Sequence, residues 1–203
     1  MLRKFTRFTL VLGLLFSSFW TRPAPATVVE LFANGSLSKN YLATDSWVTS
    51  LSTGIGMAVV VIPHLRIEGR YTNISSLQNQ LNAAVSGVTV NLSNIKTTTT
   101  MYTLGVNIDF LSEKSPFQPY IYLGGGYVDT ERSYYASLPG QTDSQYIAES
   151  PQRGLSANAG LGIRLRIAQQ IALELEAYAY AEDVQTKHPL VNIYGTAGIR
   201  IFI

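Results

Sequence analysis

From about residue 27 to the last residue, apolar and polar side chains alternate with a period of two. Between residues 102 and 110 the apolar positions are Tyr102, Leu104, Val106, Ile108 and Phe110, and the positions between them hold Thr103, Gly105, Asn107 and Asp109. Successive side chains of an extended chain point to opposite faces, so this pattern predicts β-strands with one apolar and one polar face. We expect eight such strands, near residues 28–35, 51–61, 65–72, 102–110, 120–128, 155–167, 171–180 and 191–203.

The links between these strands alternate in length. Three are short, at residues 63–64, 111–118 and 168–170, and four are long and polar, near residues 36–48, 74–97, 129–153 and 182–190. An even number of antiparallel strands with short turns at one end and long loops at the other is typical of an outer-membrane barrel. The sequence therefore predicts an all-β fold, an eight-stranded antiparallel up-and-down transmembrane β-barrel, as one domain over residues 27–203.

Residues 1–26 have the features of a secretory signal peptide. The basic residues Arg3, Lys4 and Arg7 lead into an apolar stretch at residues 8–20, which is too short for a membrane-spanning helix. A small-residue sequence, Ala-Pro-Ala, then predicts cleavage before Thr27. The alternative is a membrane-anchoring or core helix. Together with the predicted barrel, export points to the cell outer membrane as the location of the mature chain.

Cleavage would reverse the sign of the net charge. Four of the 15 basic residues and none of the 13 acidic residues lie in the segment, so the net charge changes from +2 to 11 − 13 = −2. A nucleic-acid-binding protein needs a basic surface, which the mature chain lacks. The chain has no Cys, which excludes disulfides, thiolate metal sites and a Cys nucleophile.

The polar face of the strands carries five basic and five acidic residues. They are Arg66, Glu68, Arg70, Asp109, Arg164, Arg166, Glu174, Glu176, Glu182 and Arg200. The lumen of an eight-stranded barrel is barely wide enough for side chains, and charges buried there must be paired. We expect an ion-pair network inside the barrel. A soluble lipocalin-like binder would instead point its apolar face inward and its charges to water.

Several aromatic side chains that are expected on the apolar face lie at the predicted strand ends. Trp47, Tyr71, Tyr102 and Tyr127 lie toward the long loops, and Phe110 lies toward the short turns. Amphipathic rings favour the membrane–water boundary, where they form girdles. These positions therefore favour lipid outside the barrel.

Three stretches carry a resemblance to a known family. They are Pro-Tyr-Ile-Tyr-Leu-Gly-Gly-Gly-Tyr at 119–127, Gly-Leu-Gly-Ile-Arg at 160–164 and Gly-Ile-Arg-Ile-Phe at 198–202. With them the chain resembles the outer-membrane protein A-like and opacity-protein-like eight-stranded barrels over about residues 27–203. The resemblance implies a surface-exposed structural, adhesive or antigenic protein and names no substrate. The family usually ends on an aromatic residue, whereas this chain ends on Ile203.

Little in the sequence points to catalysis. His64 lies in a short turn and His188 in the last long loop, and neither has Ser or Asp at an obvious strand-face spacing. Glu174 and Glu176 could form a carboxylate dyad, but arginines on the same face favour ion pairing. We expect no enzyme activity, no metal and no cofactor. The alternative is an outer-membrane lipid-modifying hydrolase that uses His188.

The long loops carry most of the expected binding function. Residues 74–97 and 129–153 are rich in Ser, Thr, Asn, Gln and Tyr, which suit contacts with proteins or glycans. Tyr134 and Tyr135 are the best single contact candidates, because Tyr is common at binding hot spots. We expect a monomer in contact with outer-membrane lipids, with host or envelope proteins or glycans as loop partners.

Overall fold

The computed structural model describes residues 29–43, 46–85, 88–111, 115–137, 143–182 and 190–203. The expected signal peptide and its cleavage site lie outside these residues. Within the described residues, no helix is long and apolar enough to span a bilayer.

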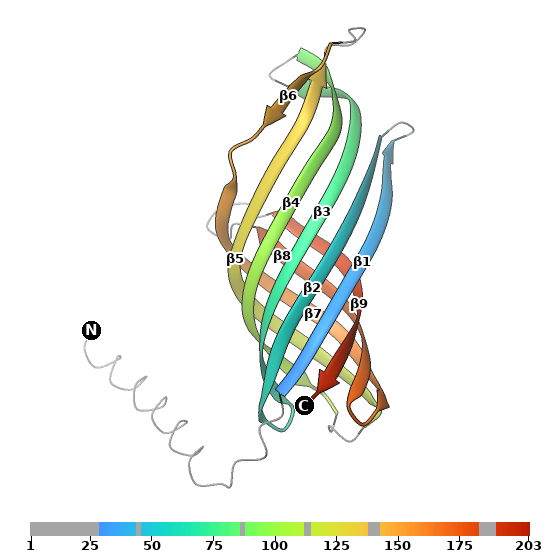
Figure 1. Cartoon of the computed structure of the whole chain (residues 1–203), viewed down its shortest axis with the longest axis vertical. Coiled ribbons are helices and arrows are strands. Elements are labelled where there is room, and N and C mark those ends of the chain that lie inside the picture. Colours follow the sequence, from blue (N-terminus) through green and yellow to red (C-terminus); the bar gives the residue numbers. More distant parts are fainter. Residues whose placement is uncertain (1–28, 44–45, 86–87, 112–114, 138–142, 183–189) are drawn as a thin grey trace, which may run out of the picture.

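Nine antiparallel strands form one sheet (Figure 1). They are β1 (Val29–Ala43), β2 (Ser46–Ile62), β3 (Leu65–Val85), β4 (Val88–Asp109), β5 (Phe117–Ser137), β6 (Gln145–Ala148), β7 (Gln152–Ala168), β8 (Ile171–Glu182) and β9 (Leu190–Phe202). Eight of them close into a barrel because β1 pairs with β9 and β4 pairs with β5. The short strand β6 pairs only with the end of β5. The predicted fold class is confirmed.

The pairing register fixes the shape of the barrel. One row of paired residues starts at Tyr127 on β5 and continues through Tyr102, Tyr71, Ile55, Ala33, Ile199, Leu173 and Leu165. It returns to β5 at Phe117, ten residues from its start. A shear of ten over eight strands, with a rise of about 3.3 Å and a spacing of about 4.8 Å, tilts the strands by about 40°. This tilt lies in the range of outer-membrane barrels.

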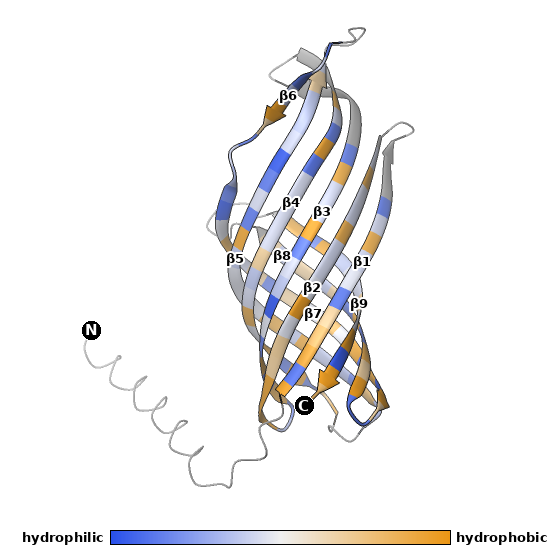
Figure 2. Ribbon diagram, in the orientation of Figure 1, coloured by the Kyte–Doolittle hydropathy of each residue, from blue (hydrophilic) through white to orange (hydrophobic). Residues whose placement is uncertain are grey.

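The apolar face of the sheet points outward and the charged face points inward. The outward Leu104 and Leu161 are 65% and 61% exposed, whereas Arg66, Arg164 and Arg200 are at most 1% exposed. Figure 2 shows hydrophobic residues concentrated toward the end of the barrel where the C-terminus lies. A soluble lipocalin-like binder would have apolar side chains inside and charges outside, which is the reverse of this arrangement.

Several strands are longer than the alternation predicts. Residues 36–48 and 74–97, expected as long loops, lie mostly in strands: β1 continues to Ala43, β3 continues to Val85, and β4 begins at Val88. Part of 129–153 likewise belongs to β5 and β6. Above the membrane the outer face of a strand no longer meets lipid, so polar residues occupy both parities and the period of two disappears. Of the fourth predicted loop, residues 183–189 lie outside the described residues.

The short turns lie at the opposite end of the barrel. Only Pro63 and His64 separate β2 from β3, and His64 adopts a left-handed φ of 72°. Gln169 and Gln170 form the turn between β7 and β8. Tight turns at this end and long extensions at the other give the barrel the asymmetry of an outer-membrane protein.

Candidate functional site

A cluster of charged side chains fills the lumen near the short-turn end. Arg200 lies at its centre and is fully buried. Its guanidinium contacts three carboxylates: Nη1 lies 2.9 Å from Glu30 Oε2, and Nη2 lies 3.0 Å from Glu68 Oε2 and 2.9 Å from Glu174 Oε1. These acids come from β1, β3 and β8, so one arginine of β9 links four strands across the lumen.

Two further arginines extend the cluster sideways. Arg164 Nη1 lies 3.1 Å from Asp109 Oδ1, and Arg164 Nη2 lies 3.3 Å from Glu174 Oε1. Arg66 Nε lies 2.7 Å from Glu30 Oε1, and its Nη1 contacts Asp109. The alternating cations and anions give each carboxylate in this layer at least two arginine partners.

Arg70 forms the upper edge of the cluster and connects it to aromatic rings. It contacts Glu68, and its Nη1 lies 2.8 Å from Glu176 Oε2. Its guanidinium carbon lies 3.8 Å from the centre of the Tyr122 ring and 5.4 Å from that of Tyr178. We call the layer of rings above Arg70 the tyrosine layer; its members are Tyr122, Tyr178, Tyr180 and Tyr194.

Glycines provide the space for these large side chains. A Cβ at Gly160 would lie 2.0 Å from Glu176 Oε1, and a Cβ at Gly162 would lie 2.4 Å from the Tyr120 ring. Both glycines point into the lumen from β7. The glycine-rich inner face is therefore what lets an eight-stranded barrel hold this many arginines and tyrosines.

The structure places most of the sequence-predicted charged residues in this cluster. They are Arg66, Glu68, Arg70, Asp109, Arg164, Glu174, Glu176 and Arg200. Arg166 is half-buried at the rim, where its guanidinium lies 4.4 Å from the centre of the Phe202 ring. Glu182 is the last residue of β8, and its side chain lies outside the described part of the structure. Sequence reasoning missed Glu30, although it shares the inward parity of Phe32.

The acidic residues of the cluster are paired with arginines. Glu174 and Glu176, considered as a dyad, are instead bound by Arg164, Arg200 and Arg70. Among the described residues, no group of three or more His, Asp or Glu side chains could hold a metal ion. His64 is exposed in its turn, and His188 lies outside the described residues.

The outward aromatic residues mark two levels of the barrel. Tyr71, Tyr102 and Tyr127 lie in one register row across β3, β4 and β5, and the Tyr71 and Tyr102 rings are 5.3 Å apart. Phe110 is 58% exposed near the short turns. The outward residues immediately above the tyrosine row are Asn73, Thr100 and Asp129. Trp47 lies higher on β2, with Lys39 Nζ 5.6 Å from its ring centre.

Beyond this row, β3, β4, β5 and β6 continue as a sheet, which we call the outer sheet (Figure 1). Tyr134 and Tyr135 lie on β5 and differ in surroundings. Tyr134 packs against the buried side chains of Leu92 and Ile95. Tyr135 is exposed, and its ring lies 5.3 Å from that of Tyr146 on β6.

A polar pocket of about 310 Å³ lies beside this aromatic pair. Its charged walls are Lys96 on β4, Glu131 and Arg132 on β5, and Glu149 after β6. Arg132 Nη1 lies 3.9 Å from Glu149 Oε1. Because both signs of charge and an exposed tyrosine lie together here, the outer sheet offers hydrogen-bond donors and hydrogen-bond acceptors to a partner.

The barrel is closed, carries an apolar belt on its outside with an aromatic row at the upper edge, and has a charged, filled lumen. These features define an outer-membrane β-barrel protein. The chain belongs to the family described as outer membrane protein beta-barrel domain, whose sequence profile matches residues 12–188. The family match places the chain in the cell outer membrane.

One solved structure supports the fold, and others are similar to the chain. A major outer membrane protein from Thermus thermophilus is 11% identical, with 88% of this chain and all of that chain covered and a TM-score of 0.52. Neisserial surface protein A is 17% identical, covering 89% and 99% of the two chains with a TM-score of 0.44. The N-terminal barrel of Pseudomonas aeruginosa OprF is 14% identical, covering 87% and 97% with a TM-score of 0.44. No curated protein sequence matches the chain.

Proposed function

We propose that this protein is a non-enzymatic surface protein, in which a plugged barrel anchors the outer sheet and the outer sheet binds proteins or glycans outside the cell. The observation that carries the proposal is the length of β3, β4 and β5 beyond the tyrosine row. β3 runs from Tyr71 to Val85 above that row, a rise of about 35 Å at the barrel tilt. A structure of this height is far larger than a barrel needs for closure in the membrane.

The chemistry of the outer sheet supports a binding role. Tyr135 and Tyr146 are 40% and 57% exposed and lie together beside a pocket with charges of both signs. Exposed tyrosines supply large contact areas at low entropic cost, and binding hot spots are rich in them. The filled lumen supports an anchoring role for the barrel, because its side chains occupy the path that a solute would take.

The test uses the protein in lipid nanodiscs against arrays of extracellular-matrix proteins and of neutral and sulfated glycans. Any ligand found should bind at least about tenfold more weakly to Tyr135→Ala and Tyr146→Ala. Leu77→Ala, on β3 of the same sheet, is the matched control, because Leu77 is also exposed. Equal weakening by all three variants, or binding that survives both tyrosine changes, would contradict this assignment.

The enzyme alternative is tested separately. Replacing His188 with Ala should leave the lipid A profile of cells that express the protein unchanged. A change in acylation that depends on His188, in a variant that folds normally, would replace the proposed function with a hydrolase.

A further inference from the structure

The seam that closes the barrel is incomplete. β1 and β9 pair from Glu30 with Phe202 up to Gly35 with Ala197, and their pairing ends there. Both strands continue upward, β1 paired with β2 and β9 paired with β8.

The separation leaves backbone groups facing the gap. Val29 and Ile203 exchange N–H···O bonds of 3.3 and 2.8 Å, which makes them a hydrogen-bonded pair. Such pairs recur at every second residue of an antiparallel ladder, so the next pair above Gly35 and Ala197 would be Leu37 and Gly195. Their N–H and C=O groups point toward the gap and are not joined across it by the ladder.

The gap begins at the upper edge of the lipid-facing belt, just above the last pair, Gly35 and Ala197. Gly35 is on the register row of Pro119, Ile163, Leu175 and Ala197. Because the strands are tilted, a row of paired residues changes its height along the barrel axis at each step from one strand to the next. At β1 this row lies about 8 Å below the level of Tyr127, near the upper edge of the belt. Unpaired backbone groups at this depth are costly, so a polar partner for them is favoured.

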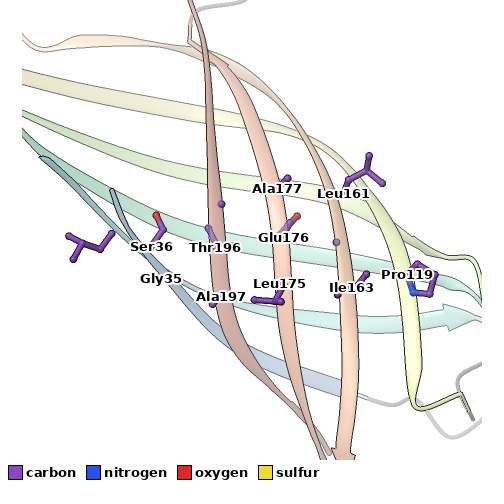
Figure 3. Close-up of a pocket in the computed structure, with 13 residues that line it drawn as sticks. Gly35, Ser36, Pro119, Leu161, Ile163, Leu175, Glu176, Ala177, Thr196 and Ala197 are labelled. Atoms are coloured by element: carbon purple, nitrogen blue, oxygen red, sulfur yellow. The ribbon is translucent and has the colours of Figure 1, made fainter. Parts of the chain in front are cut away.

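A groove leads from the gap down the outer wall. It is shallow and open to the outside, has a volume of about 760 Å³, and is lined by the apolar side chains of Leu37, Leu161, Ile163 and Leu175. Figure 3 shows the last three of these on β7 and β8. It ends at Pro119, four strand spacings from β1, a span of about 19 Å. That span is comparable to the roughly 15 Å depth of hydrocarbon in one leaflet. The groove has the length and lining for an acyl chain.

Polar groups lie at the upper end of the groove. Ser36 and Thr196, one on each side of the gap, both line it. Behind the gap, Tyr178 packs against Tyr194 with ring centres 5.2 Å apart. The Tyr178 hydroxyl is buried and has no hydrogen-bond partner among the described residues. A hydroxyl or carboxyl head group would find both donors and acceptors there.

We propose that the β1–β9 gap is a lateral binding site for a single-chain amphiphile from the outer leaflet. Its acyl chain lies in the groove over β9, β8 and β7, and its hydroxyl or carboxyl head enters the gap between Ser36 and Thr196. The site is independent of the proposed binding by the outer sheet, so each can fail without the other.

The opposite wall of the barrel provides an internal comparison. A second groove, also about 760 Å³, includes Leu31, Met57, Gly69, Leu104 and Gly125. These residues form one unbroken register row, so this groove has no gap behind it. It shares the size and apolar lining of the first groove and lacks the opening.

The test is photo-crosslinking of a diazirine-bearing palmitic acid to the protein in phosphatidylcholine nanodiscs, with the labelled residues mapped by mass spectrometry. Labelling should be saturable, displaced by unlabelled palmitic acid, and concentrated at residues 35–37 and 195–197. Gly195→Phe should lower it at least about tenfold, because a Cβ at Gly195 meets open space and the ring would fill the groove. Gly69→Phe, at an equally open glycine in the second groove, is the matched control.

Labelling spread evenly over the apolar belt, or unchanged by Gly195→Phe, would overturn the proposal. Displacement by a diacyl phosphatidylglycerol but not by palmitic acid would overturn the single-chain assignment. If Gly195→Phe does not fold, Ser36→Ala combined with Thr196→Val is used instead. This double variant removes the hydroxyl groups that would contact the head of the amphiphile and leaves the apolar sides of the groove unchanged. That variant must also lose the saturable labelling.

Discussion

Removing the Arg200 guanidinium is the most direct perturbation of the lumen cluster. Arg200→Met keeps an unbranched side chain of similar length and removes the charge at the centre. The change takes one cation from Glu30, Glu68 and Glu174, all of which are at most 5% exposed. Water does not reach these carboxylates to replace it.

The loss of stability depends on which arginine partners each carboxylate keeps. Breaking a buried ion pair by removing one partner costs about 3–5 kcal/mol. Each of the three carboxylates keeps a second arginine: Arg66 for Glu30, Arg70 for Glu68 and Arg164 for Glu174. We therefore expect the lower end of the range, about 3 kcal/mol. Adding Glu174→Gln to the variant restores the charge balance and should recover part of that loss.

The assay is urea unfolding of the refolded protein in detergent micelles or vesicles, followed by the heat-dependent shift of the folded barrel on a gel. Arg166→Met is the control, because Arg166 is half-buried and stacks on Phe202 at the rim; its loss should cost about 0.5–1 kcal/mol. If Arg200→Met destabilises no more than Arg166→Met, the cluster does not stabilise the barrel as argued.

Three further predictions test other parts of the structure. Leu161→Arg on the lipid face, near the middle of the belt, should lower the free energy of unfolding in vesicles by about 2–4 kcal/mol; an unchanged value would contradict the outward assignment. In planar bilayers the wild-type protein should give no large, stable single-channel currents, and their regular appearance would refute the plug. The chain has no native Cys, so disulfide formation can map the seam: Ala33→Cys with Ile199→Cys should oxidise readily, because these residues are paired, whereas Leu37→Cys with Gly195→Cys should not. Equal oxidation of both pairs would show that the seam is closed.

The sequence predicts the part of this fold that lies in the membrane, and the reason is physical. Between lipid and a filled lumen, each residue must suit one of two opposite environments, so parity alone identifies the eight barrel strands. Above the tyrosine row this constraint ends. Thr98 and Thr99 point to opposite faces of β4 and are equally polar, so nothing in their order indicates a strand. The four-residue strand β6 is missed for the same reason.

The candidate sites divide in a similar way. Parity places Arg200 and Glu174 on the inner face, but the pairing of particular atoms depends on the register between strands far apart in the sequence. Glu30 was missed because the short alternation near residues 28–35 is weak evidence taken alone. The gap at Gly35 and Ala197 could not be predicted, since it depends on where the first and last strands stop pairing.

The outer sheet and the gap in the seam have a common cause. β1 follows β2 along the wall that continues upward, and its pairing with β2 runs to Ala43 and Ser46. β9 is held by β8, and that ladder reaches Glu182 and Leu190. The two walls rise along different paths above Gly35, so the ladder between β1 and β9 cannot continue with both. The wall that extends above the membrane thus leaves the β1–β9 seam open at the edge of the outer leaflet, and this is where the proposed lipid-derived ligand would bind.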